Sequence, residues 1–150
     1  MSFFLNNITS EQMFEELLQD HRIALVRFGF SERPECVRLD RLLSTLNKSV
    51  HRYFAIAAYE IKDVTPPLRK KYKITDSAQN ILVFFSKGVP IYVSFCKRPN
   101  FQITEEIPGS EELLSLLVTV HQGVTHNKRI INVYGTCFEG NRSQKRKEDT

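Results

Sequence analysis

The sequence predicts an α/β fold in which helices cover both faces of a mixed central β-sheet. Short apolar runs that are typical of strands alternate with segments whose apolar residues recur at helical spacing. Near residue 88, two apolar runs are separated only by a short segment containing glycine, which is typical of an antiparallel hairpin. The chain has 150 residues, of which 41% are hydrophobic, so one domain with its own core is expected.

The first part of the chain predicts a helix followed by a buried strand. A short apolar entry at residues 3–5 precedes the helix. Thr9 or Ser10 can accept a hydrogen bond from the free N–H groups of the first helical turn, and Gln12 would complete a capping box. Residues 23–28 form an apolar run interrupted by one arginine, which predicts a strand with little solvent on either face.

A long amphipathic helix is predicted to begin at Pro34, because proline suits the first turn of a helix. Its apolar residues recur on one helix face; they are Leu39, Leu42, Leu43, Leu46 and Val50. Residues 53–61 then predict a second buried strand. If the two strands lie parallel, the helix between them makes a right-handed crossover.

The next segment predicts a short basic helix at residues 66–72 and then a hairpin. The runs 81–85 and 89–95 are rich in residues that favour strands, and residues 86–88 connect them. Pro90 lacks an N–H group, so the second of these strands is expected at the edge of the sheet.

A final helix is predicted after the break at Pro108 and Gly109. Ser110 is expected to begin this helix, and Gly123 is expected to end it, because glycine favours the position just after a helix. The predicted order along the chain is β-α-β-α-β-α-β-β-α.

Composition and cysteine spacing exclude several classes of protein. The three cysteines lie far apart and form no Cys-x-x-Cys pair, so neither a zinc ribbon nor a dithiol site is expected. No segment resembles a signal peptide or reaches the length of a membrane span, which predicts an intracellular protein with reduced thiols. A net charge of +4 favours anionic partners only weakly.

The predicted order is that of the thioredoxin fold, so a thiol active site would lie in the turn after residues 23–28. In thioredoxins a Cys-x-x-Cys motif occupies this turn, and the helix N-terminus lowers the pKa of the attacking thiol. Counting along the chain places Arg33 at the first cysteine position and Cys36 at the second. A guanidinium group is not a nucleophile, and residues 77–80 hold no counterpart of the thioredoxin cis-proline. We therefore interpret Arg33, Pro34 and Cys36 as a vestigial thioredoxin site without dithiol exchange.

Several residues around this turn resemble one branch of the thioredoxin superfamily. Arg27-Phe28-Gly29, followed at fixed spacing by Pro34, Cys36 and Asp40, resembles the signature of the DIM family, the thioredoxin-like small subunit of the spliceosomal U5 snRNP. The similarity covers residues 1–137, which we take as one domain. Residues 138–150 form a basic tail that is expected to be disordered.

The sequence departs from the family pattern in two places. Residues 31–33 read Ser-Glu-Arg where the family commonly has Asp-Trp-Asp. Residues 77–80 lack the Pro-Cys pair that many members carry, so Cys36 lacks the partner of a family disulfide. These departures leave two branches open: a divergent U5 subunit, or the DIM-like splicing paralog that binds the tri-snRNP bridging protein.

The resemblance implies a non-catalytic component of the U4/U6·U5 tri-snRNP that acts in pre-mRNA splicing in the nucleus. It further implies contacts with the large U5 scaffold protein and with the bridging protein of the tri-snRNP, and spliceosomal snRNA or pre-mRNA nearby. No cofactor, no metal and no membrane contact is expected. Outside the complex we expect a monomer.

Two basic segments are candidate binding sites for RNA or for a protein partner. The first comprises Arg69, Lys70, Lys71 and Lys73, which surround Tyr72 in the short basic helix. Its cations suit phosphates and Tyr72 suits stacking on an unpaired base, but a solvated helix face with Tyr72 packed inward explains the same pattern.

The second basic segment is Lys128-Arg129, followed by the apolar run 130–134. This run is either an added strand that packs on its own domain or an arm that docks on a partner. The charge row Arg38, Arg41, Lys48 and Arg52 on the long helix either faces a partner or is solvated.

Two hypotheses from other classes also remain open. The first is a redox protein that uses Cys36 alone, and the second is a free-standing RNA-binding module. The four histidines are scattered, and the sequence contains neither a glycine-rich phosphate loop nor a nucleophile elbow. An enzyme is therefore not expected.

Overall fold

The computed structural model of the protein describes residues 6–75, 80–95 and 98–133. Its strands are β1 (Asn6–Ile8), β2 (Ile23–Gly29), β3 (Phe54–Glu60), β4 (Asn80–Ser86), β5 (Val89–Pro90), β6 (Tyr92–Ser94) and β7 (Ile130–Asn132). Its helices are α1 (Glu11–Leu18), α2 (Pro34–Val50), α3 (Pro66–Tyr72) and α4 (Ser110–Thr125), and a 3-10 turn η1 (Ile61–Asp63) precedes α3. Within the described residues, this order confirms the predicted α/β fold.

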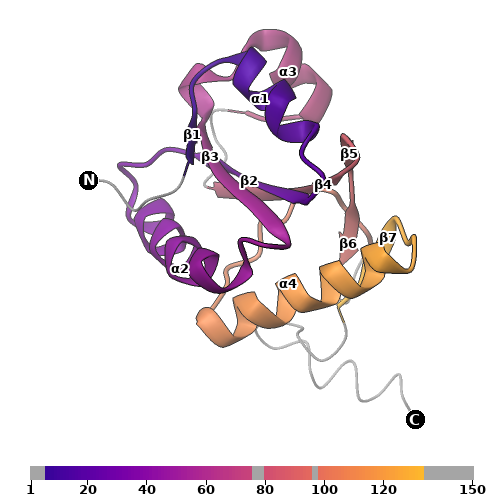
Figure 1. Ribbon diagram of the computed structural model, residues 1–150. Helices are drawn as coiled ribbons and strands as arrows, with labels where there is room; N and C mark the ends of the chain where they lie inside the picture. Colours follow the sequence, from indigo (N-terminus) through magenta and orange to yellow (C-terminus); the bar gives the residue numbers. More distant parts are fainter. Residues whose placement is uncertain (1–5, 76–79, 96–97, 134–150) are drawn as a thin grey trace.

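The central sheet is mixed, as predicted. Five strands lie in the order β1-β3-β2-β4-β5 (Figure 1). β3 pairs in parallel with both β1 and β2, whereas β4 is antiparallel to β2 and to β5. The parallel β2 and β3 flank α2 in sequence, which makes this crossover the expected β-α-β unit.

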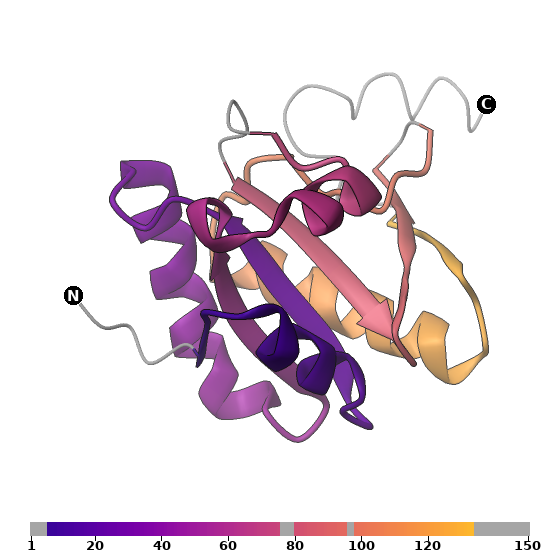
Figure 2. The same cartoon turned by 90° about the horizontal axis from the view of Figure 1, so that it is seen from above.

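Helices cover both faces of the sheet and divide the core in two. In Figures 1 and 2, α1 and α3 lie over one face, and α2 and α4 lie over the other. Successive residues of β2 alternate between the cores: Leu25 packs with the leucines of α2 and α4, while Val26 packs with Phe14 of α1 and Tyr72 of α3. All seven residues of β2 are buried, which explains its nearly unbroken apolar sequence.

The N-terminal elements begin slightly differently from the prediction. The first described strand is β1, and residues 3–5 lie outside the described residues. Ser10 caps α1 by accepting a hydrogen bond from the N–H group of Met13 at 3.2 Å. The capping box of Thr9 and Gln12 does not form, because Ser10 is the N-cap and Met13 therefore takes the position that the box requires for Gln12.

The predicted hairpin is present, but its second strand divides. Lys87 and Gly88 form a two-residue turn with φ values of 54° and 80°, which are typical of a type I′ hairpin. After Pro90 the chain leaves the central sheet, and β6 pairs in parallel with β7 in a separate two-stranded sheet. β5 therefore lies at the edge of the central sheet, as Pro90 predicted.

The sequence predicted that Gly123 ends α4, and this prediction was wrong. The helix continues to Thr125, and Asn127 takes the left-handed conformation after it with a φ of 61°. Gly123 instead allows β7 to approach the helix, because a Cβ atom at this position would lie 2.7 Å from Cγ1 and Cδ1 of Ile131. The small sheet is thus packed directly against the last turns of α4.

The predicted boundary at residue 137 and the basic tail 138–150 lie outside the described residues and stay predictions. In the part of the chain that the structure covers, no helix is long and apolar enough to cross a membrane.

We expect Gly123→Val to lower the free energy of unfolding by about 1–3 kcal/mol, because the added side chain overpacks the contact with Ile131. Urea denaturation measures this loss. The control is Gln122→Val at the adjacent exposed position, which changes stability by less than about 0.5 kcal/mol. Equal losses in the two variants would contradict the assigned role of Gly123.

Candidate functional site

The vestigial site lies where β2 runs into α2. Arg33 is the residue just before α2, Pro34 is its first residue, and Cys36 lies in its first turn. The Arg33 N–H donates to the carbonyl of Phe30 at 3.0 Å, and its guanidinium lies 4.4 Å from the centre of the Phe30 ring. The structure therefore brings Arg33, Pro34 and Cys36 together at the start of α2, in the turn where the vestigial site is predicted.

Cys36 is in the wrong state for a nucleophile. The residue is completely buried and is a free thiol. Burial raises the pKa of the Cys36 thiol above its usual value, although a hydrogen bond from the Phe30 backbone and the charge of Arg27 oppose this shift. Because only the thiolate attacks disulfides, this thiol is poorly suited to exchange.

A buried ionic cluster lies beside Cys36. The Arg27 guanidinium is fully buried and makes a bidentate contact with Asp40 of α2, with Nε at 2.7 Å from Oδ1 and Nη2 at 2.5 Å from Oδ2. Its Nη1 lies 3.2 Å from Oε2 of Glu60 at the end of β3, but without hydrogen-bond geometry. Arg27 Nη2 also donates to the Ser31 hydroxyl at 3.1 Å. The cluster thus joins β2, α2, β3 and the vestigial turn.

Contacts within the cluster favour the charged forms of Arg27 and Glu60. Burial opposes ionisation of Glu60, but hydrogen bonds from the Ser31 hydroxyl and N–H and the charge of Arg27 lower the Glu60 pKa overall. Burial likewise opposes the charge of Arg27, but Asp40 and Glu60 raise its pKa overall. The sequence identified Arg27 and Asp40 only as parts of a signature, and Glu60 was the member that reasoning from β2 and α2 missed.

An acidic cavity opens next to the vestigial site. It has a volume of about 270 Å³ and lies between α2, β4 and the loop before α4. Three glutamates, Glu35, Glu105 and Glu106, line it together with Arg38 and with apolar side chains that include Leu39 and Ile103. Because the three carboxylates outnumber the one guanidinium, the cavity disfavours phosphate groups.

The first basic candidate divides into an internal part and an external part. Arg69 points inward: its Nε donates to the carbonyl of Val64 at 3.1 Å and its Nη2 to the carbonyl of Ile61 at 2.7 Å. Arg69 therefore ties α3 to η1 and is engaged within the fold. Lys70, Lys71 and Lys73 are exposed and remain candidates.

Tyr72 is not available for base stacking, because only 3% of its surface is exposed. Its ring packs against Phe14 at 5.9 Å and against Phe85 at 5.5 Å between ring centres. Of the two interpretations of this segment, the inward-packed Tyr72 is therefore correct.

The second basic candidate follows α4. Lys128 and Arg129 are both exposed in the turn before β7. Ile131 and Val133 are buried in the core beside α4, which confirms that this segment packs on its own domain as an added strand. Ile130 nevertheless leaves 54% of its surface exposed, so the strand also presents an apolar side chain outward.

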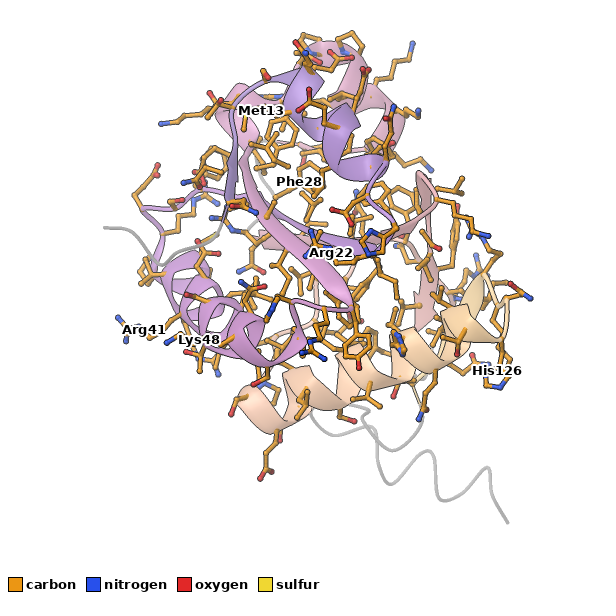
Figure 3. All side chains as sticks on the ribbon, viewed as in Figure 1. Met13, Arg22, Phe28, Arg41, Lys48 and His126 are labelled. Carbon is orange, nitrogen blue, oxygen red and sulfur yellow. The ribbon has the colours of Figure 1, made fainter. Side chains whose placement is uncertain are left out.

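The basic residues of α2 do not all have the same role: one of them binds the loop before α4, and others point to solvent. Arg38 donates from Nη1 to the carbonyl of Ile107 at 2.8 Å and from Nη2 to the carbonyl of Pro108, so it fastens the loop before α4. Figure 3 shows Arg41 and Lys48 projecting outward from α2. The row is therefore not one continuous binding face.

We expect Glu60→Gln to lower the free energy of unfolding by about 1.5–3 kcal/mol at neutral pH, because it removes charged hydrogen bonds with Ser31 and the attraction to Arg27. The pKa of Glu60 is lower in the folded state than its usual value of 4.5. Its stabilisation is therefore complete well above pH 4.5 and disappears as the pH falls through the lower, folded-state pKa.

Urea denaturation of the unmodified protein and of Glu60→Gln is measured across this pH range. Their free energies of unfolding should converge as the pH falls. Asp20, whose pKa Arg22 lowers to about 2 by a hydrogen bond, is present in both proteins and cancels in the difference. The matched control is Glu32→Gln, at an exposed carboxylate in the same turn. A difference that does not change with pH would refute the charged state of Glu60.

We also expect Cys36 to resist alkylation in the folded protein. In a variant with Cys96→Ser and Cys137→Ser, iodoacetamide should react at least about tenfold more slowly in buffer than in urea at the same pH, because exposure of the thiol requires local opening. Mass spectrometry follows the reaction. Equal rates in the two conditions would show that the thiol is accessible.

The chain matches known proteins in sequence along most of its length. A family model described as "Mitosis protein DIM1" matches residues 4–136. Spliceosomal protein DIB1 of Candida glabrata is 26% identical over 130 residues, which cover 85% of this chain and 89% of that protein. Mitosis protein dim1 of Schizosaccharomyces pombe and thioredoxin-like protein 4B of Homo sapiens are each 23% identical over 133 residues; the matches cover 87% of this chain and, respectively, 92% and 87% of those proteins.

The fold also matches solved thioredoxins. A mutant thioredoxin from Halobacterium salinarum superposes with a TM-score of 0.59 at 15% identity, covering 79% of this chain and 91% of that chain. Plasmodium falciparum thioredoxin gives a TM-score of 0.56 at 13% identity, and the match covers 76% of this chain and 97% of that chain. At such identities the likeness shows the fold alone. The fold is therefore thioredoxin-like, and the match over residues 4–136 shows that the chain belongs to the DIM1 family.

Proposed function

We propose that the protein is a non-catalytic component of the spliceosomal U5 snRNP and of the U4/U6·U5 tri-snRNP, and that it acts in pre-mRNA splicing in the nucleus. The observation that carries the proposal is membership of the DIM1 family, in which the matching DIB1 relatives are named spliceosomal proteins. The expected contacts are with the large U5 scaffold protein and with the tri-snRNP bridging protein.

The chemistry of the vestigial site supports a role without catalysis. Arg33 occupies the place of the attacking cysteine, and burial keeps Cys36 protonated. A redox activity based on Cys36 alone would need a thiolate, which the raised pKa disfavours. The buried ionic cluster of Arg27, Asp40 and Glu60 instead makes this region a rigid part of the domain.

A rigid domain with faces of different charge suits an assembly subunit. The acidic cavity lies beside α2, whereas exposed lysines lie at the end of α3 and after α4. Surfaces of opposite sign orient partners and discriminate against incorrect ones, even where they add little to affinity. Such a subunit needs no reactive group.

Affinity capture of the tagged full-length protein from nuclear extract tests the proposal. We expect U4, U5 and U6 RNAs to be enriched together, relative to a tagged thioredoxin of the same fold, as measured by quantitative reverse transcription of the captured RNA. Capture of U5 RNA alone would restrict the role to the U5 particle. Enrichment of none of the three RNAs would overturn the proposal.

A further inference from the structure

Side-chain contacts connect the two basic segments that lie far apart in the sequence. Gln102 donates from its amide to the carbonyls of Tyr72 at 2.7 Å and Lys73 at 3.0 Å, which holds the neighbouring Phe101 against the end of α3. The Phe101 ring lies 6.4 Å from the Tyr72 ring and 5.7 Å from the ring of Tyr92 on β6. Phe101 and Gln102 therefore link the surface around the end of α3 to the small sheet.

From β6 the same surface continues to the turn before β7. The Tyr92 N–H donates to the carbonyl of Arg129 at 2.9 Å, and Tyr92 lies in register with Ile130. Residues in register on paired strands present their side chains on the same face. Tyr92 is 42% exposed and Ile130 is 54% exposed. Figure 1 shows β6 and β7 side by side at the C-terminal end of α4.

Exposed cations lie at both ends of this surface. Lys71 and Lys73 are at the α3 end, and Lys128 and Arg129 are at the β7 end. Among the described residues, none of these four cations forms an ion pair with a carboxylate. We call Tyr92, Phe101 and these four cations the aromatic–basic surface. It combines unpaired positive charge with a half-exposed aromatic ring.

We propose that the aromatic–basic surface binds single-stranded RNA, with phosphates against the four cations and one base stacked on Tyr92. Lysine and arginine bind phosphates with release of counterions, and aromatic rings bind unpaired bases by stacking. An acidic polypeptide would also neutralise the cations, but a carboxylate has no aromatic face that could stack on the exposed Tyr92 ring. The inference rests on the proposed function, because that function brings the protein into contact with RNA.

The other faces of the described structure are less suitable. The acidic cavity repels phosphate through Glu35, Glu105 and Glu106. Tyr53 is 51% exposed, and its ring packs on His121 of α4 at 4.9 Å. His121 follows the exposed Leu114 and Val118 at helical spacing, so the surroundings of Tyr53 on α4 are apolar.

Fluorescence anisotropy of a labelled short oligouridylate with the full-length protein tests the surface. We expect Tyr92→Leu to weaken binding about 5- to 150-fold, since stacking of one base is worth about 1–3 kcal/mol, while the leucine keeps the packing against Phe101. Tyr92→Phe should retain binding because the ring remains. The matched control, Tyr53→Leu, should bind like the unmodified protein. Thermal unfolding verifies that each variant is folded.

The salt dependence tests the cations separately. The double variant Lys128→Gln with Arg129→Gln should reduce the slope of log affinity against log salt by about 1.4, because each lost phosphate contact removes about 0.7 for a single strand. The control double variant, Lys48→Gln in α2 with Arg52→Gln in the turn after it, has the same change in charge and should keep the slope. If this control changed the slope more than the Lys128/Arg129 variant does, or if Tyr53→Leu weakened binding more than Tyr92→Leu does, the RNA site would lie near α2. Either result would overturn the inference.

Two further outcomes separate this inference from the proposed function. Binding of polyglutamate but not of oligouridylate would identify a protein partner and overturn the RNA site, although capture of the three spliceosomal RNAs by the same protein would leave the proposed function intact. Conversely, oligouridylate binding that depends on Tyr92, without capture of those RNAs, would support the RNA site and overturn the proposed function.

Discussion

The buried contact between Arg27 and Asp40 is the interaction on which the rest of this structure depends. A guanidinium without access to water is costly unless carboxylates pair with it, and here two of them do so from two different elements. Asp40 fixes α2 against β2, and Glu60 fixes the end of β3 and the turn that carries Ser31. The N-terminus of α2 is therefore held by charge as well as by its apolar face.

This arrangement explains why a thioredoxin-like scaffold needs no thiol chemistry to keep the region ordered. In a dithiol enzyme this turn must remain accessible to a disulfide, and its thiolate must be stabilised. Here the cluster fills the space under the turn, and Cys36 contributes volume to the interior. Arg27, Asp40 and Glu60 thus hold the turn in place without a reactive thiol.

The sequence predicted the central sheet well because its signals are local. The apolar run of β2, the helical spacing of Leu39, Leu43 and Leu46 and the proline that begins α2 each depend on neighbouring residues. Counting from β2 also placed Arg33 and Cys36 at the start of α2, where the structure has them. Glu60 was harder to assign, because its partner Arg27 is remote in sequence and only parallel pairing of β2 with β3 brings them together.

The division of the second hairpin strand could not be predicted from local pattern, because it depends on the arrival of β7 from the end of the chain. That dependence also has a kinetic consequence. Pairing two strands that are joined by a long segment loses more conformational entropy than pairing the strands of a hairpin. We therefore expect β6 and β7 to pair after the central sheet has formed. During synthesis, β6 must wait until α4 and β7 have left the ribosome. The face that contains Tyr92 is therefore expected to form after the central sheet, and a chain truncated before β7 would lack the strand that pairs with β6.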